Sequence, residues 1–123
     1  MKSNILKRPK RKVIFKNCDV EVVEITWPPG SATPFHNHGA SHGIGRVLAG
    51  SLQEHCMYSE KGASVVTYAE YKKGGVFRES PKLIHCVWNP SKTKPARSVH
   101  VYTPLLRMKE FTEEELKRRR NTQ

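Results

Sequence analysis

Six histidines are the residues of this sequence whose type and spacing point most directly to chemistry. Two of them form the pair His36-Asn37-His38. Side chains of an extended segment alternate between its faces, so these two imidazoles would point the same way, about 7 Å apart along the strand. Two imidazoles placed in this way can bind one metal ion, and a third ligand would come from a distant strand.

His85 is the candidate for that third ligand. It lies in the run 83–88, which is otherwise apolar and typical of a buried strand. An imidazole that faces an apolar interior needs polar partners or a metal ion. The plainer interpretation is that His36 and His38 lie on the surface and that His85 is a hydrogen-bonded core residue.

A second group of polar side chains shares one face of a predicted strand. Ser98, His100 and Tyr102 alternate with Val99 and Val101, so the hydroxyl, the imidazole and the phenol would line one side. These three groups could form a hydrogen-bond relay. The alternative is an exposed polar face on an edge strand, which is the commoner reason for such alternation.

The elements that must position these residues are mostly strands. Short apolar runs separated by Gly- and Pro-rich turns are typical of a β-barrel or jelly roll. Single strands are predicted over 20–27, 65–71, 83–88 and 97–102. A hairpin is predicted within 38–59, with its turn at 49–51. The alternation shifts once at Val22-Val23, which indicates a β-bulge. We therefore predict an all-β fold, a single small barrel.

Only the C-terminal end of the sequence looks helical. Thr112 and Glu115 have the spacing of a capping box. Glu114 and Arg118 are one of the acid–base pairs at i,i+4 that stabilise a helix. We expect a short surface helix and assign it no chemistry.

The length of 123 residues corresponds to one domain. We predict a basic N-terminal arm over 1–12, the barrel over 13–105 and a helical basic tail over 106–123. The formal net charge is +11, and much of it lies in the two ends. Such ends could attract nucleic acid, but no aromatic residue precedes Phe15 among the N-terminal bases, and solvated tails are the plainer interpretation.

The three cysteines, Cys18, Cys56 and Cys86, have neither the number nor the spacing of a disulfide framework. We expect no signal peptide and no membrane span, because no apolar run approaches the roughly 20 residues that a span requires. A reducing cytoplasm is the expected location. The oligomeric state is open, with a monomer as our expectation.

The histidines lie in a setting that resembles the two cupin motifs. Gly30, His36 and His38 are followed by Gly50, and the second motif reads Gly75, Pro81, His85 and Asn89. The usual cupin carboxylate ligand would fall at His42 or Gly43, so we expect it to be absent. Three neutral imidazoles would leave a metal its full +2 charge and room for a substrate. Such ligands suit Fe, Cu, Ni and Zn alike, and a hydrolytic zinc site also fits them.

A more specific resemblance is to the cysteine dioxygenase family of thiol dioxygenases. The matching segments are Trp27-Pro28-Pro29-Gly30, Pro34-Phe35-His36-Asn37-His38-Gly39, Arg46-Val47-Leu48-Ala49-Gly50-Ser51-Leu52, Leu83-Ile84-His85, Asn89-Pro90 and Ser98-Val99-His100-Val101-Tyr102-Thr103-Pro104. The resemblance implies a cupin barrel that holds Fe(II) through His36, His38 and His85. It also implies an outer-sphere triad of Ser98, His100 and Tyr102, with the phenol facing the substrate.

Two further residues follow from this resemblance. Gly43 stands where mammalian members have a cysteine that cross-links to the tyrosine, so we expect Tyr102 to be unmodified. Arg11 stands where the family has an arginine, just before the first barrel strand, that binds the substrate carboxylate. Pro9 replaces the family's usual tyrosine two residues earlier, and one more base in a basic tail is the plainer interpretation of Arg11.

The expected function is iron-dependent oxidation of a small thiol by O2, with L-cysteine converted to cysteine sulfinate. One alternative is a dioxygenase for another thiol, such as 3-mercaptopropionate. The other is a non-catalytic metal-binding cupin whose basic tails contact nucleic acid.

Overall fold

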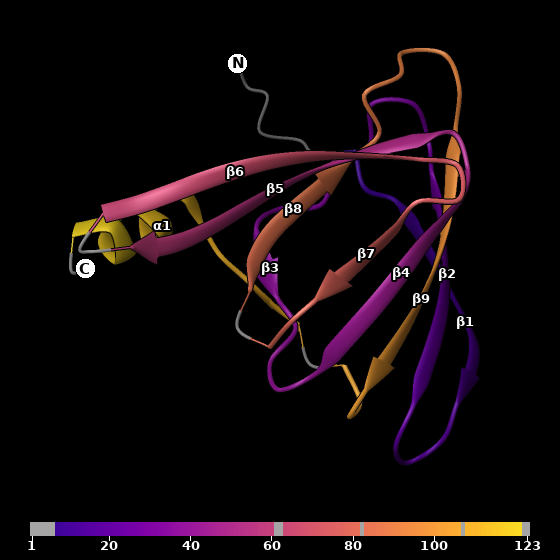
Figure 1. Cartoon of the computed structure of the whole chain (residues 1–123), viewed down its shortest axis with the longest axis horizontal. Coiled ribbons are helices and arrows are strands. Elements are labelled where there is room, and N and C mark those ends of the chain that lie inside the picture. Colours follow the sequence, from indigo (N-terminus) through magenta and orange to yellow (C-terminus); the bar gives the residue numbers. More distant parts are fainter. Residues whose placement is uncertain (1–6, 61–62, 82, 107, 122–123) are drawn as a thin grey trace.

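The computed structural model describes residues 7–60, 63–81, 83–106 and 108–121, which form two antiparallel five-stranded sheets and one helix (Figure 1). The first sheet has the order β1 (Lys10–Lys16), β2 (Glu21–Trp27), β9 (Ala96–Thr103), β4 (His42–Ala49) and β7 (Val76–Glu79). The second has the order β10 (Lys109–Glu110), β3 (His36–Asn37), β8 (Ile84–Trp88), β5 (Ser51–Glu60) and β6 (Ala63–Lys72). The helix is α1 (Glu113–Asn121). The predicted all-β fold with a short C-terminal helix is confirmed.

The main core lies between the inner faces of the two sheets. β2 alternates buried and more exposed positions, and it contributes Val23, Ile25 and Trp27. The other members of this core come from five further elements and the cluster includes Val47, Leu52, Phe77, Val87, Ala96 and Tyr102. Because inward side chains repeat every second residue, polar residues in the same register also point between the sheets.

The predicted bulge within β2 is wrong. β2 pairs with β9 in unbroken register from Glu21 to Trp27. The irregularity lies instead in β1, between Val13 and Phe15, where that strand faces β2. An extra residue is tolerated better on this edge strand, which has one neighbour, than on β2, which has two.

The predicted hairpin turn after Ala49 is confirmed, since β4 and β5 meet at Gly50. Gly50 has a φ of 75°, and a Cβ there would lie 2.9 Å from the Cβ of Ala96. Glycine is therefore required both by the backbone conformation and by the close approach of the loop before β9. β7 was not predicted, because four residues are too few to display a clear period.

α1 packs outside the second sheet, beside the end of the β5–β6 hairpin (Figure 1). The predicted capping box is confirmed: the Thr112 amide donates to Glu115 at 3.0 Å, and the Glu115 amide donates to Thr112 at 3.1 Å. Phe111 and Leu116 bury their side chains against Met57 and Ile84. In the described part of the chain, no helix has the length and apolar character needed to cross a membrane. The domain boundaries at 12 and 105 stay a prediction.

Candidate metal centre

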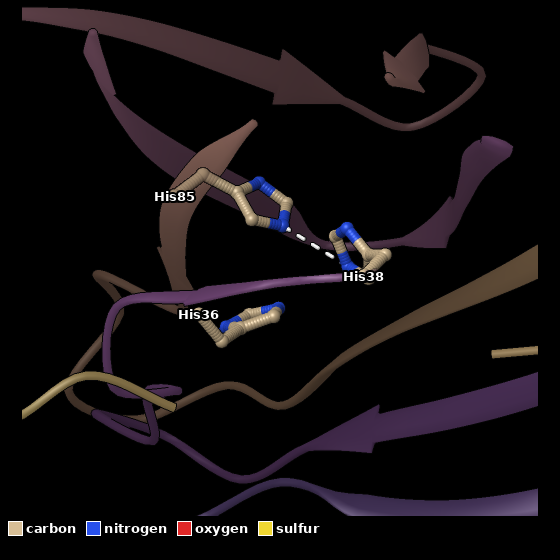
Figure 2. Close-up of side chains that lie close together, drawn as sticks. All are labelled: His36, His38 and His85. Carbon is tan, nitrogen blue, oxygen red and sulfur yellow. Dashed lines mark hydrogen bonds between the residues drawn. The ribbon is translucent and has the colours of Figure 1, made fainter. Parts of the chain in front are cut away.

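The three histidines singled out in the sequence meet between the sheets. His36 in β3 and His85 in β8 are direct cross-strand partners, so their side chains leave the second sheet on the same face. His38 follows β3 and returns to that face. Figure 2 shows the three rings turned toward one another, and one ligand nitrogen from each lies within 4.8 Å of the other two. All three side chains are buried, with at most 4% of their surface exposed.

Hydrogen bonds hold the His36 and His85 rings with one nitrogen of each directed at the common centre. His36 Nδ1 bonds the Pro34 carbonyl at 2.9 Å, and His85 Nδ1 bonds Glu54 Oε2 at 2.5 Å. Both bonds place the proton on Nδ1 and leave the Nε2 lone pair free, which is the tautomer that a metal ligand needs. All polar contacts of His38 within the described residues are made by Nε2, since its buried Nδ1 has none. Burial, followed by the neighbouring His85, lowers the pKa of His36 to about 3, so its ring is neutral.

Two buried carboxylates flank this cluster, and neither is among the site residues predicted from the sequence. Glu54 lies on β5 behind His85 and also accepts a hydrogen bond from Tyr71 at 3.2 Å. Glu79 lies at the end of β7, with Oε1 2.8 Å from His38 Nε2 and 3.5 Å from His85 Nε2. The only sequence sign of Glu54 is its even spacing from Leu52, which places both on the inner face.

Ser98, His100 and Tyr102 project from β9 into the same space. The Trp27 indole N–H donates to Ser98 Oγ at 2.9 Å, and Ser98 Oγ lies 2.7 Å from His100 Nε2. His100 Nδ1 lies 3.2 Å from Glu79 Oε2. An indole only donates and a carboxylate only accepts, so the hydroxyl donates to Nε2 and the proton on Nδ1 points at Glu79.

Tyr102 joins this relay through Glu79 and not through His100. Its hydroxyl donates to Glu79 Oε1 at 3.3 Å, while its ring stacks on His38 at 5.4 Å between centroids. Burial, reinforced by the Glu79 carboxylate, raises the pKa of Tyr102 well above its usual range. The phenol therefore remains a hydrogen-bond donor at neutral pH.

Two glycines of β4 provide the room for these side chains. A Cβ at Gly43 would lie 2.7 Å from the ring of Tyr102, and one at Gly45 would lie 2.6 Å from the ring of Phe77. Any larger residue at either position would displace an aromatic ring from the site. The bare face of β4 is thus filled by side chains from β7 and β9.

A cavity of about 40 Å³ adjoins the three imidazoles. Its walls are largely apolar and include Ile25, Trp27, Phe77 and Val87. Arg11 lines the cavity together with Pro9 and Met108. Arg11 lies within β1, opposite Ile25, and not before the first strand as expected. Glu79 raises the pKa of Tyr102, and the positive charge of Arg11 partly offsets that effect. Arg11 and Tyr102 are therefore close enough to interact electrostatically.

The donor set fits a divalent metal. Glu54 and Glu79 are at most 3% exposed, and their charged partners within the described residues are histidines. Hydrogen bonds from His100 and His38 outweigh the cost of burial and hold the pKa of Glu79 below its usual range. Two buried carboxylates so close to a group of histidine side chains make a setting that can accept a cation. Imidazole nitrogens supported by a carboxylate behind them are a common metal-binding arrangement.

The fold is shared with several solved structures. An uncharacterised conserved protein with a double-stranded β-helix domain from Klebsiella pneumoniae is 22% identical, with a TM-score of 0.69 over 89% of this chain and 92% of that one. A cupin 2 domain-containing protein from Halorhodospira halophila is 12% identical, with a TM-score of 0.72 over 90% of this chain and 75% of that one. These likenesses confirm the predicted cupin fold.

An oxalate oxidase in complex with the substrate analogue glycolate is 23% identical, with a TM-score of 0.67 over 74% of this chain. This chain spans 45% of the length of that enzyme. The sequence model of the family described as cysteine dioxygenase type I matches residues 4–114. With its three buried histidines on a cupin barrel, the chain belongs to the cysteine dioxygenase type I family.

Proposed function

We propose that the protein is an iron-dependent thiol dioxygenase that converts L-cysteine to cysteine sulfinate. The observation that carries the proposal is the group of three buried imidazoles, each with one nitrogen turned to a common centre. The reaction adds both atoms of O2 to one sulfur, so the thiol is oxidised to a sulfinic acid without a further reductant.

Fe(II) would be held by His36, His38 and His85. When bound, iron supplies a Lewis acid that favours the thiolate form of the substrate and a redox centre for O2. Glu54 holds the ring of His85 in the orientation that such binding requires. Imidazole ligands alone do not select iron over other transition metals, so the choice of iron rests on the family.

The remaining residues of the site bind and orient the substrate. Arg11 lines the cavity and offers a guanidinium that can pair with the cysteine carboxylate through two parallel hydrogen bonds. Tyr102 offers a protonated phenol beside the substrate, and its hydrogen bond to Glu79 holds that phenol in place until it can donate to the substrate instead. Tyr102 is only 4% exposed, so its interaction with the substrate would be strengthened by the exclusion of water, whereas Arg11 lies on an exposed strand.

The proposed reaction suits a reducing cytoplasm. Cys18, Cys56 and Cys86 are all free thiols in the structure. A small free thiol is also an abundant substrate only where thiols stay reduced.

The test is mass detection of cysteine sulfinate from L-cysteine, O2 and the Fe(II)-loaded protein. We expect stoichiometric O2 uptake and no product from His85→Ala. Faster oxidation of 3-mercaptopropionate than of cysteine would reassign the substrate. Retained iron without O2 uptake on either thiol would indicate a binding protein, and unchanged product formation by His85→Ala would refute the site.

A further inference from the structure

Glu79 is closer to two of the three histidines, His38 and His85, than a supporting residue needs to be. Glu54 lies behind its imidazole and bonds Nδ1, on the side away from the common centre. Glu79 instead contacts the nitrogens that would bind the metal, with Oε1 2.8 Å from His38 Nε2 and 3.5 Å from His85 Nε2. It is 2% exposed, so no bulk water competes for this oxygen.

The separations among these atoms match those between ligands of one metal ion. His38 Nε2 and His85 Nε2 lie 3.4 Å apart, and Glu79 Oε1 completes a triangle with sides of 2.8 and 3.5 Å. Ligands bound at about 2.1 Å lie about 3.0 Å apart in a cis octahedral pair and about 3.4 Å apart in a tetrahedron. A carboxylate that only supported an imidazole from behind would lie outside such a triangle.

The register of the first sheet explains how this carboxylate enters. Gly43 of β4 is the direct cross-strand partner of Glu79, so both residues face the space between the sheets at the same level. A Cβ at Gly43 would lie 3.3 Å from the Cβ of Glu79 and 2.7 Å from the ring of Tyr102. Glycine therefore leaves β4 without a side chain there, and the neighbouring strand delivers the carboxylate instead.

We propose that Glu79 is a fourth protein ligand of the metal, delivered from β7 across Gly43. This inference rests on the proposed metal centre. It changes the expected ligands from three neutral imidazoles to three imidazoles and one carboxylate. The net charge of the divalent ion together with its ligands is then +1 in place of +2. Oε1 faces the ion, while Oε2 keeps the hydrogen bond from His100.

The proposal also links the ion directly to the outer relay. Tyr102 and His100 both direct their protons at the Glu79 carboxylate. A substrate that displaced Oε1 from the ion would leave this oxygen to the phenol, which already donates to it at 3.3 Å. Glu79 acts in this way as a positioning residue for Tyr102 in addition to its role as a ligand.

The test uses the full chain loaded with Zn(II) for crystallography and with Co(II) for absorption spectroscopy. We expect a Glu79 oxygen within about 2.2 Å of the zinc ion. A nearest Glu79 oxygen beyond about 3 Å, or a water between it and the ion, would overturn the proposal. In solution, Glu79→Gln should shift the visible bands of Co(II) and weaken its binding at least about tenfold, because the amide cannot supply the negative charge.

The matched control is Glu24→Gln, which makes the same change on β2, a strand of the same sheet that is not next to β7, in a carboxylate that pairs with Arg97 at 2.8 Å. It should leave the Co(II) spectrum and affinity as in the wild type. Far-ultraviolet circular dichroism and the unfolding curve of metal-free Glu79→Gln establish that the variant folds. If it does not fold, the position of Glu79 in the Zn(II)-loaded wild type still decides the question.

The two proposals fail in different ways. If only the proposal that Glu79 is a ligand is wrong, Glu79→Gln will leave the Co(II) bands unchanged and the wild-type protein will still make cysteine sulfinate. Failure of the metal centre itself would appear as Co(II) binding that His85→Ala does not reduce.

Discussion

Glu54 and His85 form a buried pair in which the carboxylate fixes the imidazole before any ligand arrives. The carboxylate is 3% exposed and also accepts a hydrogen bond from Tyr71. Because both carboxylate oxygens are occupied, the His85 ring cannot turn without breaking a hydrogen bond to Glu54. The orientation of the third histidine is therefore set by β5 and not by β8, on which it lies.

Replacing Glu54 by glutamine should weaken metal binding without removing a ligand. An amide can present its NH2 group to His85 and so favour the wrong tautomer, and loss of such a supporting group costs about 10–100-fold in affinity. Competition between Glu54→Gln and a chelator for Co(II) measures this loss. Glu70→Gln, an exposed carboxylate on β6, is the control. Equal affinity for all three proteins would show that Glu54 does not orient His85.

Arg11 should determine whether a thiol needs a carboxylate to be oxidised. A bidentate charged hydrogen bond contributes about 1.5–3 kcal/mol, so Arg11→Ala should raise the KM for cysteine by about 10–100-fold. Cysteamine, which has no carboxylate, should be turned over equally by both proteins. Lys12→Ala, the next residue on β1, should behave as the wild type. A KM for cysteine that does not respond to Arg11→Ala would assign Arg11 to the basic surface.

At the scale of the elements, β4 contributes to the site through two positions that have no side chain. Gly43 and Gly45 face the cavity side of the sheet, where β7 and β9 contribute the large side chains. The rings of Phe77 and Tyr102 lie within 3 Å of where a Cβ would stand on these glycines. The strand acts as a flat wall against which the relay packs.

Gly43→Ala should therefore destabilise the protein and move Tyr102. Overpacking of a filled interior costs about 1–3 kcal/mol in the free energy of unfolding, which urea denaturation measures. A Gly43→Ala protein with wild-type stability would show that the ring of Tyr102 is not confined by β4.

The sequence allowed most of the long elements to be predicted, but it left out the seven-residue strand β1 and the shortest strands. β2, the turn at Gly50 and the cap at Thr112 follow local rules of alternation, backbone freedom and hydrogen bonding, so their residues suffice to predict them. β7 has four residues and gains its stability from pairing with β4, which local pattern does not reveal.

The same difference explains the site. His36 and His38 are neighbours in sequence, and their spacing alone indicates a shared face. Glu79 enters only because the register pairs it with Gly43, a tertiary fact. The prediction that no carboxylate reaches the metal position considered β4 alone, and a carboxylate from β7 reaches the histidine cluster.

At the scale of the whole molecule, the site joins the two sheets. His36 and His85 come from the second sheet, and Glu79, His100 and Tyr102 come from the first. In the metal-free protein this interface places two buried carboxylates beside the three imidazoles. A bound cation would be attracted by these carboxylates and would link both halves of the barrel.

Metal should accordingly stabilise the whole fold. A ligand at 100 times its Kd adds about 2.7 kcal/mol to the free energy of unfolding, which corresponds to a rise of about 10 °C in Tm for a domain of this size. Scanning calorimetry with Co(II), with and without a chelator, measures the shift. His85→Ala should lose most of it. A Tm that does not change with Co(II) would contradict a metal centre between the sheets.

The fluorescence of Trp27 should report metal binding in the barrel. It is one of two tryptophans, its indole is 1% exposed, and it both lines the cavity and begins the relay through Ser98. Trp88 packs instead against His55, with 4.3 Å between ring centroids. Open-shell ions quench the emission of a nearby indole, so fluorescence of the Trp88→Phe protein would follow loading in real time, without any label.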